Sequence, residues 1–163
     1  MRRSNTPVLL ALAILVIAAA SIAGALVFEA LGYQPCELCL KERIPYYAAI
    51  PIGGLAFLFA SRRQHNFSRA AFSGLTLIFT ASAVLGAYHA GIEWGLWPGP
   101  QECSGVLTHA RSPEEFLAQL QSAKVVRCDT AAIRIIGLSL AGWNVVISGG
   151  LAALAIAGVR AKQ

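Results

Sequence analysis

The strongest constraint on this chain is a set of four apolar segments, each long enough to cross a membrane. They cover residues 8–28, about 44–60, about 70–90 and about 135–159. A hydrocarbon core of roughly 30 Å is crossed by about 20 helical residues. Because lipid offers exposed backbone groups no hydrogen-bond partner, each segment is expected to be a helix. The sequence therefore predicts an all-α integral membrane four-helix bundle, with residues 1–163 forming a single membrane domain.

The charged residues agree with this class of protein. They make up 13% of the chain, about half the share that is usual in a soluble domain. A net charge of +5 could indicate a nucleic-acid partner, but the basic residues do not form one patch. No nucleic-acid partner is expected. The polar turn at 61–69 is short, so the second and third segments should be antiparallel neighbours.

The distribution of basic residues predicts the orientation in the membrane. One side carries seven basic residues and no acidic residue: Arg2, Arg3, Arg62, Arg63, Arg69, Arg160 and Lys162. The other side carries six basic and eight acidic residues, and the sums of +7 and −2 give the net +5. Because basic residues stay in the cytoplasm, both termini are expected there. The loops at about 29–43 and 91–134 then lie on the opposite side.

The first apolar segment has a second interpretation. Arg2 and Arg3 precede an apolar stretch, as they do in a signal peptide. A cleaved signal has an apolar core of about 7–15 residues, and this segment is longer. A retained first span is therefore favoured.

All four cysteines, Cys36, Cys39, Cys103 and Cys128, lie outside the spans and away from the cytoplasm. Thiols there can be oxidised and stay oxidised. The spacing pairs Cys36 with Cys39 and leaves Cys103 to meet Cys128 across the long loop. A zinc site is the alternative, but zinc favours two short-spaced ligand pairs. Only one pair is close, so no metal is expected.

The Cys36-Glu37-Leu38-Cys39 segment indicates more than a structural disulfide. Its ring is too small to add much loop-closure stability, and the pattern is typical of redox exchange. Pro45 limits how early the following helix can begin, which places Cys39 just before a helix N-terminus that favours a thiolate. Arg43, four residues later, either adds a full positive charge to Cys39 or is an interfacial arginine. A functional role is favoured.

The long loop carries the second pair. Residues 97–102 contain two prolines, cannot be helical and are expected to be mobile. Ser112-Pro113-Glu114-Glu115 is a capping box with proline at the first helical position, so it predicts a short amphipathic helix. That helix lies on the bilayer surface or packs on the spans. In both cases Cys103 stays free to reach a partner.

These features together resemble one family. The segment Cys36-Glu37-Leu38-Cys39, the pair Glu42-Arg43, the four spans and the loop from Cys103 to Cys128 are similar to the disulfide bond formation protein B (DsbB) family. The segment from Tyr88 through Trp94 to Cys103 resembles a proteobacterial branch of it. The resemblance implies a multi-pass protein of the bacterial inner membrane, with its redox cysteines on the periplasmic side.

The resemblance also implies roles for individual residues. Cys103–Cys128 would oxidise a periplasmic thioredoxin-like dithiol protein (DsbA), with Cys103 forming the mixed disulfide. Cys36–Cys39 would pass the electrons to a membrane quinone, either ubiquinone or menaquinone. Cys39 would contact the quinone and Arg43 would support it. His89 corresponds to a family histidine near the quinone, and a structural interfacial histidine is the alternative.

Three other functions stay open. A vitamin K epoxide reductase-like protein also combines four helices with Cys-x-x-Cys, but there the motif lies late in the chain and here it follows the first span. A paralogue dedicated to one substrate is closer. A structural or channel protein with two stabilising disulfides is the non-enzyme alternative, although the spans carry almost no ionisable residue to line an ion path.

Overall fold

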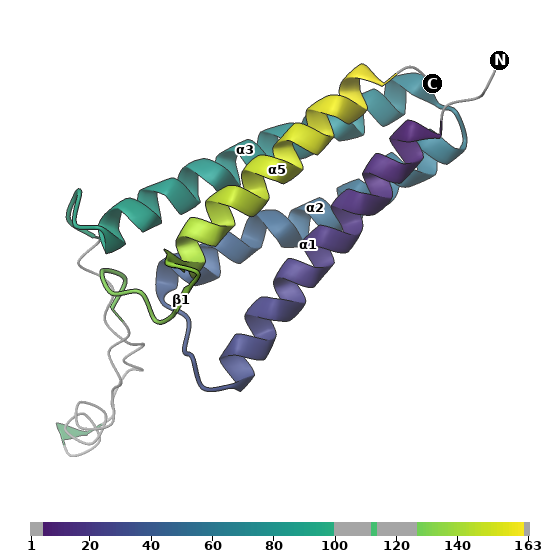
Figure 1. The fold of residues 1–163 in the computed structure, drawn as a ribbon. Helices are drawn as coiled ribbons and strands as arrows, with labels where there is room; N and C mark the ends of the chain where they lie inside the picture. The colour runs from purple at the N-terminus through teal and green to yellow at the C-terminus, as the bar shows by residue number, and fades with distance from the viewer. Residues whose placement is uncertain (1–4, 100–111, 114–126, 162–163) are drawn as a thin grey trace.

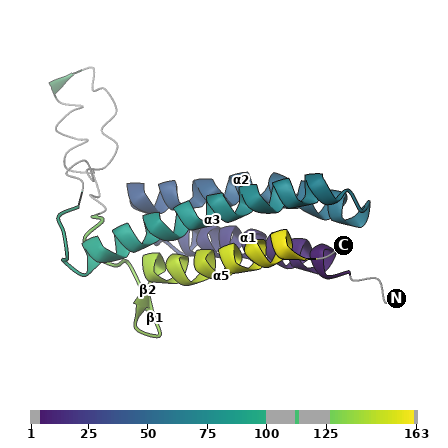
Figure 2. The same cartoon turned by 90° about the horizontal axis from the view of Figure 1, so that it is seen from above.

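The structure is a computed structural model, and it describes residues 5–99, 112–113 and 127–161. In this part of the chain four long helices lie side by side (Figure 1): α1 (Thr6–Ala30), α2 (Glu37–Ser61), α3 (His65–Glu93) and α5 (Leu140–Arg160). Each is long and apolar enough to cross a membrane. The predicted all-α membrane bundle is confirmed. The start of α2, the end of α3 and the start of α5 meet at the end away from the two termini (Figure 2).

Small side chains let the helices approach closely. Helix α3 packs most extensively on α5 and then on α2, and α1 closes the bundle against α2 and α5. The buried core alternates alanines with larger apolar residues: Ala11, Ile14, Ala18, Ala49, Ala56, Phe72, Leu75, Phe79, Leu151 and Ala155. Many large apolar side chains point outward, with Leu77 72% and Val84 66% exposed. An apolar surface with small residues inside is the pattern of helices packed in lipid.

A buried polar network joins three of the helices. The Tyr46 hydroxyl on α2 donates to Asn144 Oδ1 on α5 at 2.7 Å and lies 2.9 Å from Ser148 Oγ. The Ser148 hydroxyl donates to Ser82 Oγ on α3 at 2.9 Å. Hydrogen bonds between membrane helices fix their relative rotation. The network therefore helps to set which face of α2 meets α3.

Helix α2 begins seven residues before the predicted start at about residue 44, so that prediction is corrected. Cys36 is the N-cap, and its sulfur accepts a hydrogen bond from the Cys39 backbone N–H at 3.2 Å. Glu37 lies in the first turn and pairs with Lys41 at 2.7 Å. These contacts stabilise a turn before Pro45, which consequently lies inside the helix. Cys39 is in the first turn rather than before it.

The fourth span also differs from its predicted bounds of about 135–159, because helix α5 begins only at Leu140. The residues before it form a hairpin of β1 (Arg134–Ile135) and β2 (Leu138–Ser139). The turn between them places Ile136 and Gly137 at positive φ. Ser139 then caps α5 by accepting from the Gly142 N–H at 3.1 Å. Apolarity alone did not separate this hairpin from the helix.

The segment after α3 is held more firmly than predicted. The Trp97 indole N–H donates to the Tyr88 carbonyl at 3.0 Å, and the two rings stack with centroids 6.1 Å apart. The Trp97 ring covers Gly91, where a Cβ would lie 2.1 Å from it. The expected mobility therefore does not apply to Trp97. Cys103 and the predicted amphipathic helix beyond Pro113 lie outside the described residues.

The close packing of α3 on α5 leads to a stability prediction. A Cβ at Gly158 would lie 2.4 Å from the Phe72 ring, so Gly158→Ala should overpack this contact and destabilise the bundle by about 1–3 kcal/mol. Gly149→Ala on the same helix is the matched control, because a Cβ there meets nothing within 4 Å. Thermal unfolding in detergent measures both variants. Equal stability of the two would contradict the packing described here.

Candidate redox site

Two sulfur atoms meet at the start of α2. Cys36 and Cys39 are one helical turn apart, and their Sγ atoms lie 2.9 Å from each other as free thiols. Cys36 is only 5% exposed, whereas Cys39 is half-buried. The predicted pair is thus brought together, and the structure describes its reduced form. Two thiols at this distance need only a small movement to form a disulfide.

The Cys36 sulfur is in a setting that favours negative charge. The hydrogen bond with the Cys39 side chain is the largest of the influences that lower the pKa of Cys36 to about 4, against the opposing effect of burial. Contacts with His89 and the Cys39 N–H act in the same direction. From sequence, Cys39 was expected to be the thiolate of the pair. In the structure Cys36 is the N-cap residue, and it is Cys36 whose pKa is lowered.

This assignment predicts a thiolate in the reduced protein at acidic pH. With its pKa lowered from 9.0 to about 4, Cys36 should stay ionised as the pH falls through the usual thiol range and become protonated only near the lower value. Thiolate ultraviolet absorbance of the reduced protein, compared with Cys36→Ser, measures this. An absorbance difference that disappears with a midpoint near 9.0 would contradict the assignment.

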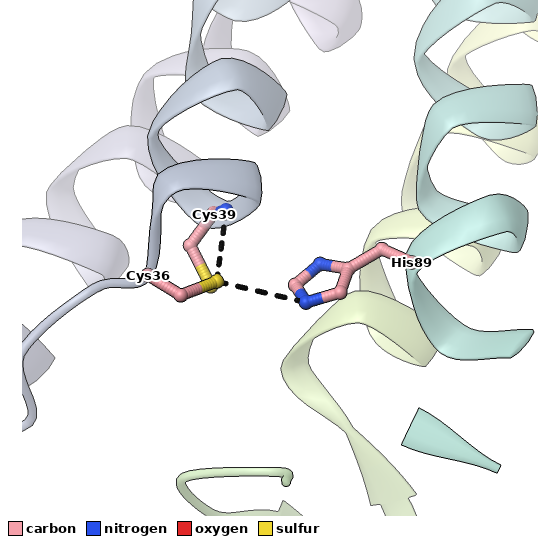
Figure 3. A group of neighbouring side chains, drawn as sticks. All are labelled: Cys36, Cys39 and His89. Atoms are coloured by element: carbon pink, nitrogen blue, oxygen red, sulfur yellow. Dashed lines mark hydrogen bonds between the residues drawn. The ribbon is translucent and has the colours of Figure 1, made fainter. Parts of the chain in front are cut away.

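His89 comes to Cys36 from the facing helix α3 (Figure 3). Its Nε2 lies 3.6 Å from Cys36 Sγ, and the imidazole is 2% exposed. The other ring nitrogen, Nδ1, lies 2.8 Å from the Glu42 carboxylate on α2. The carboxylate orients the ring, so that the nitrogen facing the sulfur is fixed. Sequence reasoning had singled out His89 but had no signal for Glu42 as its partner.

A second carboxylate lies on the other side of the histidine. Glu93, one turn after His89 on α3, places Oε1 4.0 Å from His89 Nε2. Its side chain is 6% exposed, and no described group hydrogen-bonds to its Oε2. Glu93 was not predicted as a site residue, although its spacing of four from His89 on a helix could have indicated it.

Cys128 also reaches this end of the bundle. It is disulfide-bonded and 3% exposed. It belongs to one buried cluster with Cys36, Leu38 and Ile92, against which Cys39 packs. Its predicted partner Cys103 lies outside the described residues. The fold therefore brings Cys128, far along the chain, to the Cys36–Cys39 pair.

Arg43 is bonded to helix α1, and its predicted role at the quinone stays a prediction. Its guanidinium donates to the Glu29 carboxylate at 2.7 Å and to the Ala25 carbonyl at 3.5 Å, both on α1. Within the described residues no hydrogen bond joins Arg43 to Cys39. The Arg43 side chain is only 13% exposed. It is therefore fixed between helices α2 and α1 and does not extend to the membrane surface.

A cavity of about 400 Å³ opens beside Cys39 between α1, α2 and α5. Its walls are mainly apolar, with Phe28, Trp143 and Ile147 among them, and its polar groups include Cys39, Arg43 and Tyr46. A flat apolar ring with carbonyl acceptors fits such walls and donors. His89 is not among the lining residues; it lies at Cys36.

Comparison with known proteins agrees with the geometry. The family model described as "Disulfide bond formation protein DsbB" matches residues 7–158. An uncharacterised protein of Rickettsia prowazekii (strain Madrid E), RP370, is 28% identical over 118 residues. That match covers 71% of this chain and 66% of the relative, slightly less than two thirds of its length. No solved structure gives a significant match. This chain, a multi-pass membrane protein with a partly buried cysteine pair, belongs to the DsbB family of disulfide bond formation proteins.

Proposed function

We propose that this thiol oxidoreductase oxidises a periplasmic thioredoxin-like dithiol protein of the DsbA type and delivers the electrons to ubiquinone or menaquinone. The observation that carries the proposal is the burial of disulfide-bonded Cys128 in one cluster with Cys36. Two cysteine pairs that meet in a water-poor cluster can exchange disulfides directly. The range of proteins that the partner oxidises decides whether this chain belongs to a general disulfide-forming system or to one dedicated to a single substrate.

Electrons would move through two exchanges. The partner's two thiols reduce the Cys103–Cys128 disulfide, and the partner leaves oxidised after a mixed disulfide with Cys103. The loop dithiol then reduces the Cys36–Cys39 disulfide and is itself reoxidised. Because Cys128 lies beside Cys36, attack falls on the Cys36 sulfur, and Cys39 becomes the leaving thiolate. Cys39 faces the cavity, where the electrons must go next.

The cavity is where a quinone would accept these electrons. When bound, the quinone supplies a two-electron, two-proton acceptor, so that Cys36–Cys39 is returned to the disulfide. Cys39 and Arg43 would hold it from α2, and the mainly apolar walls would exclude water. The predicted quinone contact of His89 stays a prediction. The position of His89 favours another role. Its imidazole would hold a proton at the Cys36 sulfur, and Glu42 would orient the ring.

Energetics explain why an external acceptor is needed. A DsbA-like oxidant has a reduction potential near about −120 mV, whereas ordinary structural disulfides lie below about −300 mV. An inert loop disulfide would face roughly 180 mV, or about 8 kcal/mol, when oxidising such a partner. The loop pair must therefore be unusually oxidising or be drained continuously. A membrane oxidant provides that drain.

The proposed compartment leads to a labelling prediction. Single cysteines at Ser61 and Ser112, in a background without the four native cysteines, should differ in intact cells. Ser61 ends α2 on the basic side, so a membrane-impermeant thiol reagent should not label it. Ser112, in the opposite loop, should be labelled. Labelling at Ser61 would reverse the orientation and place the cysteine pairs in the reducing cytoplasm.

The direct test of the function uses the purified protein in detergent. A reduced thioredoxin-like periplasmic protein and a quinone are mixed with catalytic amounts of the protein. We expect quinone absorbance to fall in step with partner oxidation, over many turnovers. Partner oxidation that is independent of quinone, or none at all, would refute the proposal. Loop disulfides that resist mild reductant would instead support a structural protein.

A further inference from the structure

We infer that the reduced protein binds one divalent zinc ion at the sulfur–histidine cluster, formed by Cys36, Cys39 and His89. The three ligand atoms lie within 4.8 Å of one another, two from the start of α2 and one from α3 (Figure 3). Only one short-spaced cysteine pair is visible in the sequence, so no metal was predicted. The fold supplies the third ligand from 50 residues away in the chain, His89. Binding requires only the reduced thiols and does not rest on the proposed function.

The ligand types select a zinc-like ion. Two thiolates and an imidazole are the donors of Cys-rich tetrahedral zinc sites, whereas Mg²⁺ and Ca²⁺ require oxygen. Tetrahedral zinc bonds of about 2.3 Å to sulfur and about 2.0 Å to nitrogen set the S···N separation near 3.5 Å. The Cys36 Sγ to His89 Nε2 distance is 3.6 Å. The two sulfurs, 2.9 Å apart, must move apart by about 0.8 Å, which side-chain rotation can provide.

The histidine is already oriented as a ligand. Its Nδ1 lies 2.8 Å from the buried Glu42 carboxylate, and its Nε2 faces the sulfurs. A carboxylate on the outer nitrogen is the usual support of a metal-bound histidine, because it fixes the ring and strengthens the ligand. Glu42 is 8% exposed, so this support is held inside the protein.

Glu93 lies beside this three-ligand cluster and would supply the fourth ligand after a movement of its side chain. Its Oε1 lies 4.0 Å from His89 Nε2, and its Oε2 is buried without a hydrogen-bond partner among the described residues. A buried carboxylate oxygen without a partner is costly. A cation between the sulfurs and His89 would stabilise it. Two thiolates and one carboxylate carry three negative charges against the two positive charges of the ion, which leaves a net charge of −1 at the metal.

Binding and oxidation exclude each other. The ion displaces the Cys39 proton and the proton that His89 holds at the ionised Cys36 sulfur, and no electron is transferred. The Cys36–Cys39 disulfide has no thiolate to offer, so the oxidised protein cannot hold the ion in this way. Zinc therefore stabilises the dithiol state alone. At free zinc about 100-fold above its dissociation constant, oxidation of the pair by any acceptor should slow by about 100-fold.

The test uses full-length protein carrying Cys103→Ser and Cys128→Ser, so that the loop thiols cannot bind zinc. The reduced protein is titrated anaerobically with Zn²⁺ against a chromophoric chelator, and with Co²⁺ for its thiolate charge-transfer and d–d absorption. We expect one ion per chain, tetrahedral Co²⁺ spectra, and no binding after oxidation. Glu42→Gln and Glu93→Gln should each weaken binding by about 10–100-fold. Glu37→Gln, an exposed acid on the same helix, should have no effect.

His89→Gln separates this site from adventitious binding to two thiols. Loss of the ligand should weaken binding by at least about 100-fold and change the Co²⁺ spectrum. Binding that is unchanged in His89→Gln and Glu93→Gln, or absent from the wild-type pair, would overturn the inference. Gel filtration and thermal unfolding establish that each variant is folded. Quinone reduction is measured separately, without zinc, on the protein with all four cysteines. The metal site and the proposed function can therefore fail independently of each other.

Discussion

The variant Cys36→Ser/Cys39→Ser should carry out one exchange with the reduced partner and then stop. Its loop disulfide can still accept two electrons, but the reduced loop pair then has no route to the cavity beside Cys39. Steady-state quinone reduction should fall below detection, while one partner molecule is oxidised per chain. Quench experiments that count oxidised partner, alongside quinone absorbance, measure both quantities.

A companion variant shows where the exchange begins. When the partner carries only its attacking cysteine, that thiolate should open the Cys103–Cys128 disulfide, release Cys128 as a thiolate and stay bonded to Cys103, because the partner lacks the second thiol that would displace it. A protein whose disulfides are only structural would give no adduct. Sustained quinone reduction by Cys36→Ser/Cys39→Ser would mean that the loop reaches quinone directly. The relay would then be wrong, although the membrane fold would stand.

Arg43→Met should lower quinone kcat/KM by about 10–150-fold, corresponding to a lost charge-assisted interaction of about 1.5–3 kcal/mol. Arg43 is the basic residue that lines the cavity with Cys39, so under the proposed function its loss removes a hydrogen-bond donor to the quinone. Steady-state kinetics at varied quinone concentration measure the effect, with thermal unfolding as a check on folding.

Two further variants separate a quinone role from a structural one. Lys41→Met removes a basic residue from the exposed face of the same helix, where Lys41 pairs with Glu37, and should leave the kinetics unchanged. Glu29→Gln removes the carboxylate that holds Arg43 at 2.7 Å but keeps the guanidinium. It should reduce kcat/KM less than Arg43→Met does. Wild-type kinetics in Arg43→Met would make Arg43 an interhelical anchor only.

The spans and the cysteine pair were predictable because their signals are local. An apolar segment of about 20 residues identifies a membrane helix without reference to its neighbours, and Cys36 and Cys39 lie three residues apart. The early start of α2 was not predictable by the same rules. Sulfur is not among the usual capping atoms, and Pro45 argued for a later start. The cap was visible only in the structure.

The contacts of His89 depend on how the helices are rotated. The Tyr46–Asn144 hydrogen bond and the packing of α2 on α3 bring Glu42 and Cys36 to the same face as His89. Hydropathy carries no information on that rotation, so the sequence did not indicate Glu42 as the partner of His89. The same limit applied to Cys128, which is far from Cys36 in the sequence but lies in the same buried cluster.

The central claim, that both cysteine pairs are connected to quinone, is tested most directly by stoichiometry. The fully reduced protein, with all four cysteines as thiols, is mixed anaerobically with excess quinone in the absence of any partner. Each pair yields two electrons on forming a disulfide. The account predicts two quinones reduced per chain and no remaining thiols. One quinone per chain, with Cys103 and Cys128 still reduced, would contradict it.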